Sequence, residues 1–232
     1  MTTSPAPSKV HDYTSARSLR LYAFVRWLVI TASARPWRVQ VHGADRVPTD
    51  GAFVFAPSHR SMLDITWLTL VTRRRIRFMG KASLFRVPLL GALFSALGGF
   101  AVERDGSDRA PLRDSLAILD SGDALAVYPE GTRQHGPRIQ PLQPGAAYLA
   151  IKAQVPIVPV ALAGTEEPFR SGRRFPRFDP GVVVVGTPIQ PPVRTGSVVK
   201  RELVDQLNAQ LLVAMQELFD EAYAVRAERL AR

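Results

Sequence analysis

The chain alternates between short apolar runs and longer segments in which apolar residues recur at helical spacing. Short apolar runs bounded by glycine, proline or polar residues predict buried strands, which we expect at residues 37–42, 52–56, 76–79, 100–103, 124–128, 157–163 and 182–185. The longer segments predict helices, which we expect at residues 15–34, 65–71, 81–85, 111–120, 143–153 and 198–229. This alternation predicts an α/β fold, a single domain with a mixed, mostly parallel sheet flanked by helices.

The N-terminal part differs from the rest. Residues 1–14 are polar and are expected to be loose, and residues 15–34 mix arginines with leucine, phenylalanine, tyrosine and tryptophan. This mixture is typical of an amphipathic helix in a membrane interface, although a helix packed on the core has a similar pattern. The apolar stretch is too short to span a bilayer comfortably, and no signal peptide is expected. We therefore divide the chain into an N-terminal segment, residues 1–35, and one folded domain, residues 36–232.

The net charge of the chain indicates which kinds of partner to expect. The 232 residues carry a formal charge of +10, with 26 arginines and four lysines, which suits an anionic membrane or a phosphorylated substrate. A general preference for arginine codons explains the composition equally well. A non-catalytic protein that binds anionic membranes or nucleic acid is a remote alternative. The basic residues are spread over several loops without a recognition-helix motif, so no nucleic-acid partner is predicted.

The absence of cysteine excludes disulfides, thiolate nucleophiles and sulfur-ligated metals, and four scattered histidines predict no metal site. The candidate catalytic residues instead lie within residues 58–64, between a predicted strand and a predicted helix. His59 can act as a general base held by the carboxylate of Asp64. Residues five apart in a helix differ by about 140° around the axis, so the pair works only with His59 in the turn and Asp64 in the first helical turn. Alternatively, Ser61 and Asp64 form only a capping box.

Two further motifs end predicted strands. Residues 98–104 form a glycine-rich strand that presents Arg104, and residues 127–133 form a strand and turn in which Gly131 permits a tight backbone and Arg133 offers a planar fork. If both strands are parallel to the one before His59, all three ends lie on one edge of the sheet.

Together these motifs resemble the glycerolipid acyltransferase family, which contains the bacterial 1-acylglycerol-3-phosphate acyltransferases. Four blocks occur in order over roughly residues 50–165: His59 to Asp64, Gly98 to Arg104, Tyr128 to Arg133, and Val155 to Val160. Lys81, before a Leu-Phe-x-x-Pro segment, fits the same pattern. Tyr128 replaces the usual Phe, and Gln134 stands where many members have Ser.

The resemblance implies the glycerolipid-acyltransferase fold and acyl transfer from acyl-CoA or acyl carrier protein to a hydroxyl of a phosphorylated glycerolipid, with 1-acyl-sn-glycerol-3-phosphate as the expected acceptor in phospholipid biosynthesis. It implies that His59 and Asp64 are catalytic and that Lys81, Arg104 and Arg133 bind the acceptor phosphate. Glu130, with Gly131 and Thr132 beside it, would orient the glycerol hydroxyls or hold an arginine in place. Glycerol-3-phosphate, a lysophospholipid and a glycolipid remain alternative acceptors.

No cofactor or metal is implied beyond the acyl thioester co-substrate. The implied location is the cytoplasmic face of the cell membrane, as a peripheral or monotopic protein. The arginine-rich loop 169–180 can contact anionic headgroups, or can be a solvated loop. The apolar residues 87–97 can line an acyl pocket, or can belong to the core.

Overall fold

The computed structural model describes residues 16–102, 110–166, 178–194 and 196–232. Its described strands form one seven-stranded sheet in the order β1-β7-β6-β2-β5-β3-β4. The strands are β1 (Gln40–His42), β2 (Phe53–Pro57), β3 (Ile76–Lys81), β4 (Gly99–Val102), β5 (Ala124–Ala126), β6 (Ile157–Ala163) and β7 (Val182–Val185). The five neighbours from β6 to β4 are parallel, whereas β7 is antiparallel to β6, and β1 is parallel to β7. This confirms the predicted mixed, mostly parallel sheet.

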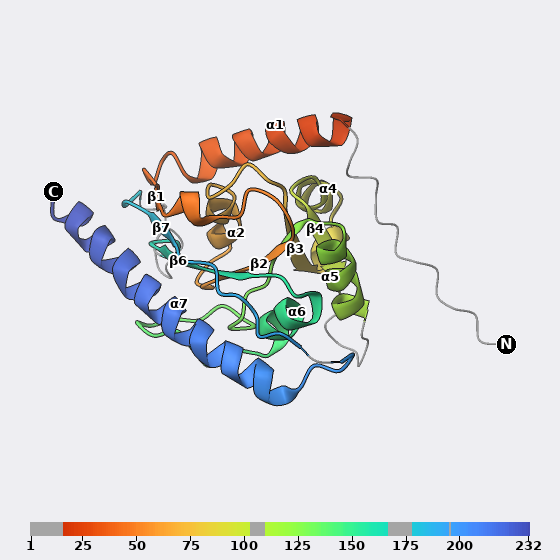
Figure 1. Ribbon diagram of the computed structural model, residues 1–232. Helices are drawn as coiled ribbons and strands as arrows, with labels where there is room; N and C mark the ends of the chain where they lie inside the picture. Colours follow the sequence, from red (N-terminus) through yellow and green to blue (C-terminus); the bar gives the residue numbers. More distant parts are fainter. Residues whose placement is uncertain (1–15, 103–109, 167–177, 195) are drawn as a thin grey trace.

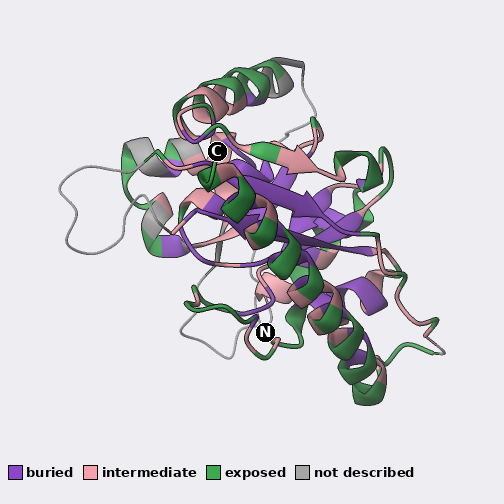
Figure 2. Ribbon diagram, turned by 90° about the vertical axis from the view of Figure 1, so that its left-hand side faces the viewer, coloured by how far each residue is buried: buried purple, intermediate pink, exposed green. Residues whose placement is uncertain are grey.

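Helices cover both faces of this sheet (Figure 1). They are α1 (Ala16–Ser33), α2 (Leu63–Leu68), α3 (Ala82–Phe85), α4 (Pro88–Ala96), α5 (Ala110–Asp120), α6 (Gly145–Ala153) and α7 (Arg201–Leu230), with a short 3-10 helix at Ala44–Arg46. Helices α1 and α2 lie on one face, and α6 and α7 lie on the other. In Figure 2 the strands are almost wholly buried between these layers, and α7 crosses them with one buried and one exposed side.

The two hydrophobic layers follow from the alternation of side chains along each strand. In β2, Val54 and Ala56 pack with α5, α6 and α7, whereas Phe53 and Phe55 pack with α2 and with Trp37 on the opposite face. Because the strands are buried on both faces, they appear in the sequence as continuous apolar runs, which is why their positions could be predicted.

Several predicted boundaries need correction. The strand expected at 124–128 ends at Ala126, and the helices expected from residues 143 and 198 begin at Gly145 and Arg201. The strand expected at 37–42 begins only at Gln40, because Arg38 has a left-handed φ of 44° that ends a turn. Lys81 is the last residue of β3 and does not start a helix, since β3 stays paired with β4 up to the Lys81–Val102 register. Helix α2 starts at Leu63, two residues earlier than expected, and ends at Leu68.

Two polar side chains of helix α1 point towards the rest of the protein and bind it. The Arg26 guanidinium donates to the backbone oxygens of Thr69 and Thr72, at 2.8–3.0 Å, and so binds the end of α2. Tyr22 is also buried, and its hydroxyl donates to Arg74 O. The outward side carries large apolar residues that are each at least half exposed: Leu21, Phe24, Trp27 and Leu28. No helix in the described part of the chain is both long and apolar enough to cross a bilayer.

Candidate active site

The turn from β2 to α2 carries His59, and the parallel strands place other motifs beside it. The carboxyl ends of β6, β2, β5, β3 and β4 lie at one edge of the sheet, in that order. His59 follows β2, and residues 128–133 follow the neighbouring strand β5. Lys81 ends β3, the next strand, and Arg104 follows β4 in the sequence. The condition for a shared edge, parallel strands, is therefore met.

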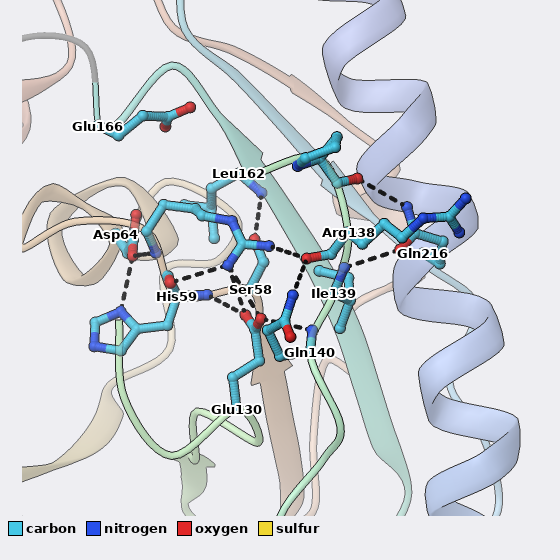
Figure 3. Close-up of polar contacts among 12 residues, drawn as sticks. Ser58, His59, Asp64, Glu130, Arg138, Ile139, Gln140, Leu162, Glu166 and Gln216 are labelled. Carbon is cyan, nitrogen blue, oxygen red and sulfur yellow. Dashed lines mark hydrogen bonds and ion pairs between the residues drawn. The ribbon is translucent and has the colours of Figure 1, made fainter. Parts of the chain in front are cut away.

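His59 and Asp64 lie in direct contact. Asp64 is in the first turn of α2, and its Oδ2 is 2.9 Å from His59 Nδ1 (Figure 3). The Asp64 side chain is completely buried, whereas the His59 side chain is 16% exposed. With Nδ1 bound to the carboxylate, Nε2 is left as the nitrogen that can accept a proton from a substrate.

Asp64 also fixes the turn. Its Oδ2 accepts the backbone N–H groups of Arg60 at 2.6 Å and Ser61 at 2.8 Å. The capping interpretation and the dyad interpretation are therefore compatible, because one carboxylate oxygen receives both kinds of donor. Ser61 is not the N-cap: Met62 has that position, and Ser61 Oγ accepts the N–H of Leu63 at 3.3 Å.

Glu130 binds the same turn from the β5 side. Its Oε1 accepts the backbone N–H of His59 at 3.0 Å, and its Oε2 accepts the Arg60 guanidinium at 3.0 Å and the N–H of Gln140 at 3.1 Å (Figure 3). Both side chains of the Arg60–Glu130 pair are almost completely buried. A buried pair of this kind is retained in an apolar interior only when each partner satisfies the other.

Arg60 is the residue that sequence reasoning missed, although it lies inside the singled-out stretch. Its guanidinium also donates to Arg138 O at 3.1 Å and lies 4.8 Å from the centre of the Phe219 ring of α7. Gln216 of α7 holds the same loop, because its side-chain oxygen accepts the N–H of Ile139 at 2.9 Å (Figure 3). No local pattern predicts that an arginine beside a histidine contacts a helix more than 150 positions away.

Tyr128 packs against the imidazole. The ring centres of Tyr128 and His59 are 4.1 Å apart, and the ring planes are inclined by 31°. Burial, and secondarily the charge of Asp64, raises the pKa of the Tyr128 hydroxyl well above its ordinary value. The phenol therefore stays neutral beside the dyad.

The remaining predicted site residues differ in exposure. Gly131 has a φ of 74° and closes the turn through its N–H to Tyr128 O at 3.0 Å, and Thr132 and Arg133 are exposed. The next residue, Gln134, donates its N–H to His59 O at 2.8 Å, so the turn and the histidine are joined. The side chain of Lys81 and the whole of Arg104 lie outside the described part, as do residues 169–177 of the arginine-rich loop.

Comparison with known proteins agrees with this arrangement. A family model described as Acyltransferase matches residues 38–163. A 1-acyl-sn-glycerol-3-phosphate acyltransferase of Bacillus subtilis is 26% identical over 65% of this chain and 73% of its own length. The chloroplast 1-acyl-sn-glycerol-3-phosphate acyltransferase of Brassica napus is 29% identical over 63% of this chain but only 43% of its own length.

The fold is also that of a solved structure. The crystal structure of the 1-acyl-sn-glycerophosphate acyltransferase of Thermotoga maritima has a TM-score of 0.67 and 23% sequence identity, and the match covers 86% of this chain and 80% of that one. The family match includes the dyad, Lys81, the Tyr128–Arg133 turn and β6, and it extends over more than half of the chain. This chain belongs to the acyltransferase family.

Proposed function

We propose that this protein transfers a fatty acyl group from an acyl thioester to the free hydroxyl of 1-acyl-sn-glycerol-3-phosphate, giving phosphatidic acid. The observation that carries the proposal is the 2.9 Å contact between His59 Nδ1 and the buried Asp64 carboxylate at the carboxyl edge of the sheet. The relatives from Bacillus subtilis and Brassica napus are named for this reaction.

The dyad supports a direct transfer. Nε2 of His59 accepts the proton of the acceptor hydroxyl as its oxygen attacks the thioester carbonyl, and Asp64 stabilises the imidazolium that forms. The tetrahedral intermediate then collapses, the carbon–sulfur bond breaks, and the departing thiolate takes the proton from Nε2. The acceptor oxygen is the nucleophile throughout, so no acyl-enzyme is formed.

The acceptor phosphate is assigned to the basic residues at the neighbouring strand ends. Arg133 lies in the turn after β5, which is next to β2; Lys81 ends β3, one strand further along, and Arg104 follows β4. Arg133 is exposed, as a substrate-facing group must be before binding. Gly131 and Thr132 are assigned to the same substrate-binding turn. Glu130 contacts Arg60 and the His59 backbone, which supports a role in holding the turn.

The test is acceptor-dependent thiol release from a long-chain acyl-CoA, with wild type compared with His59→Ala. Release with 1-acyl-sn-glycerol-3-phosphate that disappears in the variant supports the proposal. Parallel reactions with acyl carrier protein as donor, and with glycerol-3-phosphate, a lysophospholipid and a glycolipid as acceptors, identify the substrates. Normal turnover by a folded His59→Ala protein contradicts the mechanism.

We further propose that the protein binds an anionic membrane surface at the cytoplasmic face through α1. The four outward apolar residues of α1 would be costly to leave in water, and together they form the kind of surface that enters a lipid interface. A cavity of about 340 Å³ beyond the C-terminal end of α1 is lined by three arginines, Arg38, Arg229 and Arg232, and one acid, Glu228. The net positive charge of this lining supports contact with anionic headgroups.

Cosedimentation with vesicles of phosphatidylglycerol and phosphatidylcholine tests this proposal. Phe24→Ser with Trp27→Ser should release the protein from the vesicles. Val198→Ser with Val213→Ser is the matched control, because these side chains are 74% and 58% exposed but lie outside α1 and away from Arg229 and Arg232 in the sequence. Equal binding by both double variants and wild type would contradict attachment through α1.

A further inference from the structure

The Tyr128 hydroxyl has no role in the mechanism described above. It is buried, and no described residue forms a hydrogen bond with it. Buried polar groups in proteins are nearly always paired, so an unpaired hydroxyl whose own ring packs on the catalytic imidazole needs a physical explanation.

Asp64 has an unpaired hydrogen-bond acceptor. Its Oδ2 receives three donors, from His59 Nδ1 and from the backbone of Arg60 and Ser61, whereas its Oδ1 is buried without a partner among the described residues. One group is thus a donor without an acceptor, and the other is an acceptor without a donor. The Tyr128 ring packs on the same imidazole that Asp64 binds, so both side chains contact His59. Burial raises the pKa of the Tyr128 hydroxyl, so the phenol remains a protonated donor.

We propose that Tyr128 is a positioning residue of the dyad: its hydroxyl and Asp64 Oδ1 are not in hydrogen-bond contact in this structure, and a shift of the Tyr128 side chain brings the hydroxyl to Oδ1 as the donor. The catalytic meaning of this inference rests on the proposed acyl transfer. A donor on Oδ1 draws negative charge away from Oδ2 and weakens the attraction of the carboxylate for the imidazolium. A base that holds its proton less tightly returns it more readily to the departing thiolate.

Other charged groups at this edge of the sheet stay the same in the test below. Glu166, which follows β6, accepts a hydrogen bond from Tyr223 of α7. Arg60 and Glu130 form an ion pair behind the turn and neutralise each other. Arg133 is exposed at the far end of the Tyr128 turn, and Lys81 ends β3, which is separated from β2 by β5. Both Arg133 and Lys81 are present in each variant below, so a change between variants reports on the hydroxyl.

The test is Tyr128→Phe, which keeps the ring on the imidazole and removes only the hydroxyl. The pH midpoint of the His59 ring C–H resonances, followed by NMR, should rise by roughly half to one unit. The acid limb of the kcat/KM profile should move by the same amount, so activity on that limb falls about three- to tenfold while the plateau stays within about twofold. Tyr148→Phe on α6 is the matched control and should change neither quantity, because Tyr148 packs in the layer with α5 and α7.

A second comparison asks whether the hydroxyl acts through Asp64. In an Asp64→Asn background, adding Tyr128→Phe should no longer move the His59 midpoint. An unmoved midpoint in Tyr128→Phe alone, or an equal movement with and without the Asp64 carboxylate, would overturn the inference. The NMR measurement needs no substrate, so a shifted midpoint in a protein that transfers no acyl group would contradict the proposed function and leave this inference standing.

Discussion

Two carboxylates bind the His59 turn from opposite sides, and their partners indicate that one acts in catalysis and the other holds the turn in place. Asp64 comes from α2 and binds the imidazole of His59 together with the N–H groups of Arg60 and Ser61. Glu130 comes from the turn after β5 and binds the guanidinium of Arg60 together with the N–H groups of His59 and Gln140. Both side chains are fully buried.

The difference lies in what each partner does during a reaction. An imidazole gains and loses a proton near neutral pH, whereas a guanidinium remains charged. Asp64 therefore faces a group whose charge changes, and Glu130 faces a group whose charge does not. We infer that removing Asp64 mainly affects turnover and that removing Glu130 mainly affects folding.

The largest effect is expected for Asp64→Asn. The amide keeps the shape of the side chain but cannot stabilise the imidazolium, so kcat/KM should fall by about 10³-fold or more. Thiol release under subsaturating acceptor measures the loss. Circular dichroism and thermal unfolding provide the control, since the variant should remain folded; a folded Asp64→Asn protein with near-normal kcat/KM would remove the distinction between the two carboxylates.

Glu130→Ala should act mainly on stability. It leaves the Arg60 charge buried without its partner, which typically costs about 3–5 kcal/mol of unfolding free energy. Urea denaturation measures this cost, and any activity that survives should show a smaller loss than Asp64→Asn.

The matched control for Glu130→Ala replaces the whole pair. Arg60→Met with Glu130→Leu fills the space with apolar atoms and should recover most of the stability lost by the single variant. Activity should recover only in part, because the His59 N–H still lacks its acceptor. If Glu130→Ala instead keeps full stability and loses as much turnover as Asp64→Asn, Glu130 acts on the substrate, the first of its two predicted roles.

Gly131→Ala tests the turn that delivers Glu130. The residue has a φ of 74°, and an added Cβ would lie 3.1 Å from Gln143 Cγ, so a loss of about 1–2 kcal/mol of unfolding free energy is expected. Gly122→Ala is the control, since it has a φ of 85°, open space around it and no contact with the site. Both variants should lose stability, but only Gly131→Ala should lower kcat/KM; equal kcat/KM values would mean that the turn tolerates the shift.

The fold was predictable because its strands are buried on both faces. Continuous apolar runs such as residues 157–163 coincide with β6, and the local spacing of His59 and Asp64 required the turn-then-helix geometry that the structure has. Boundaries were less predictable where the cause is distant. The strand expected from residue 37 starts at Gln40, after the turn that contains Arg38.

Long-range partners were the least predictable part of the site. The contacts of Arg60 with Glu130, 70 positions away, and with Phe219 of α7 depend on how β2, β5 and α7 pack, which no local pattern specifies. For the same reason, the sequence did not predict that the Arg26 side chain points towards α2. The sequence of a helix rich in arginine and aromatic residues does not show which face packs on α2. That face is identified only in the structure, where Arg26 binds the carbonyl of Thr69.

The smallest effect is expected for a third carboxylate at the same edge, which binds neither His59 nor Arg60. Glu166 follows β6 and accepts a hydrogen bond from the Tyr223 hydroxyl of α7. Tyr223→Phe should therefore leave kcat/KM unchanged and lower the unfolding free energy by only about 1 kcal/mol.

Burial first, and then Glu166, raises the pKa of Tyr223 above its ordinary value of 10.0. The neutral phenol thus favours the folded state, and its contribution is complete below pH 10 and is lost as the pH rises towards the folded pKa. Urea denaturation at pH 8 and pH 11 should show a smaller decline with pH in Tyr223→Phe than in wild type. A fall in kcat/KM as large as that of Gly131→Ala would place Glu166 in the active site beside Asp64.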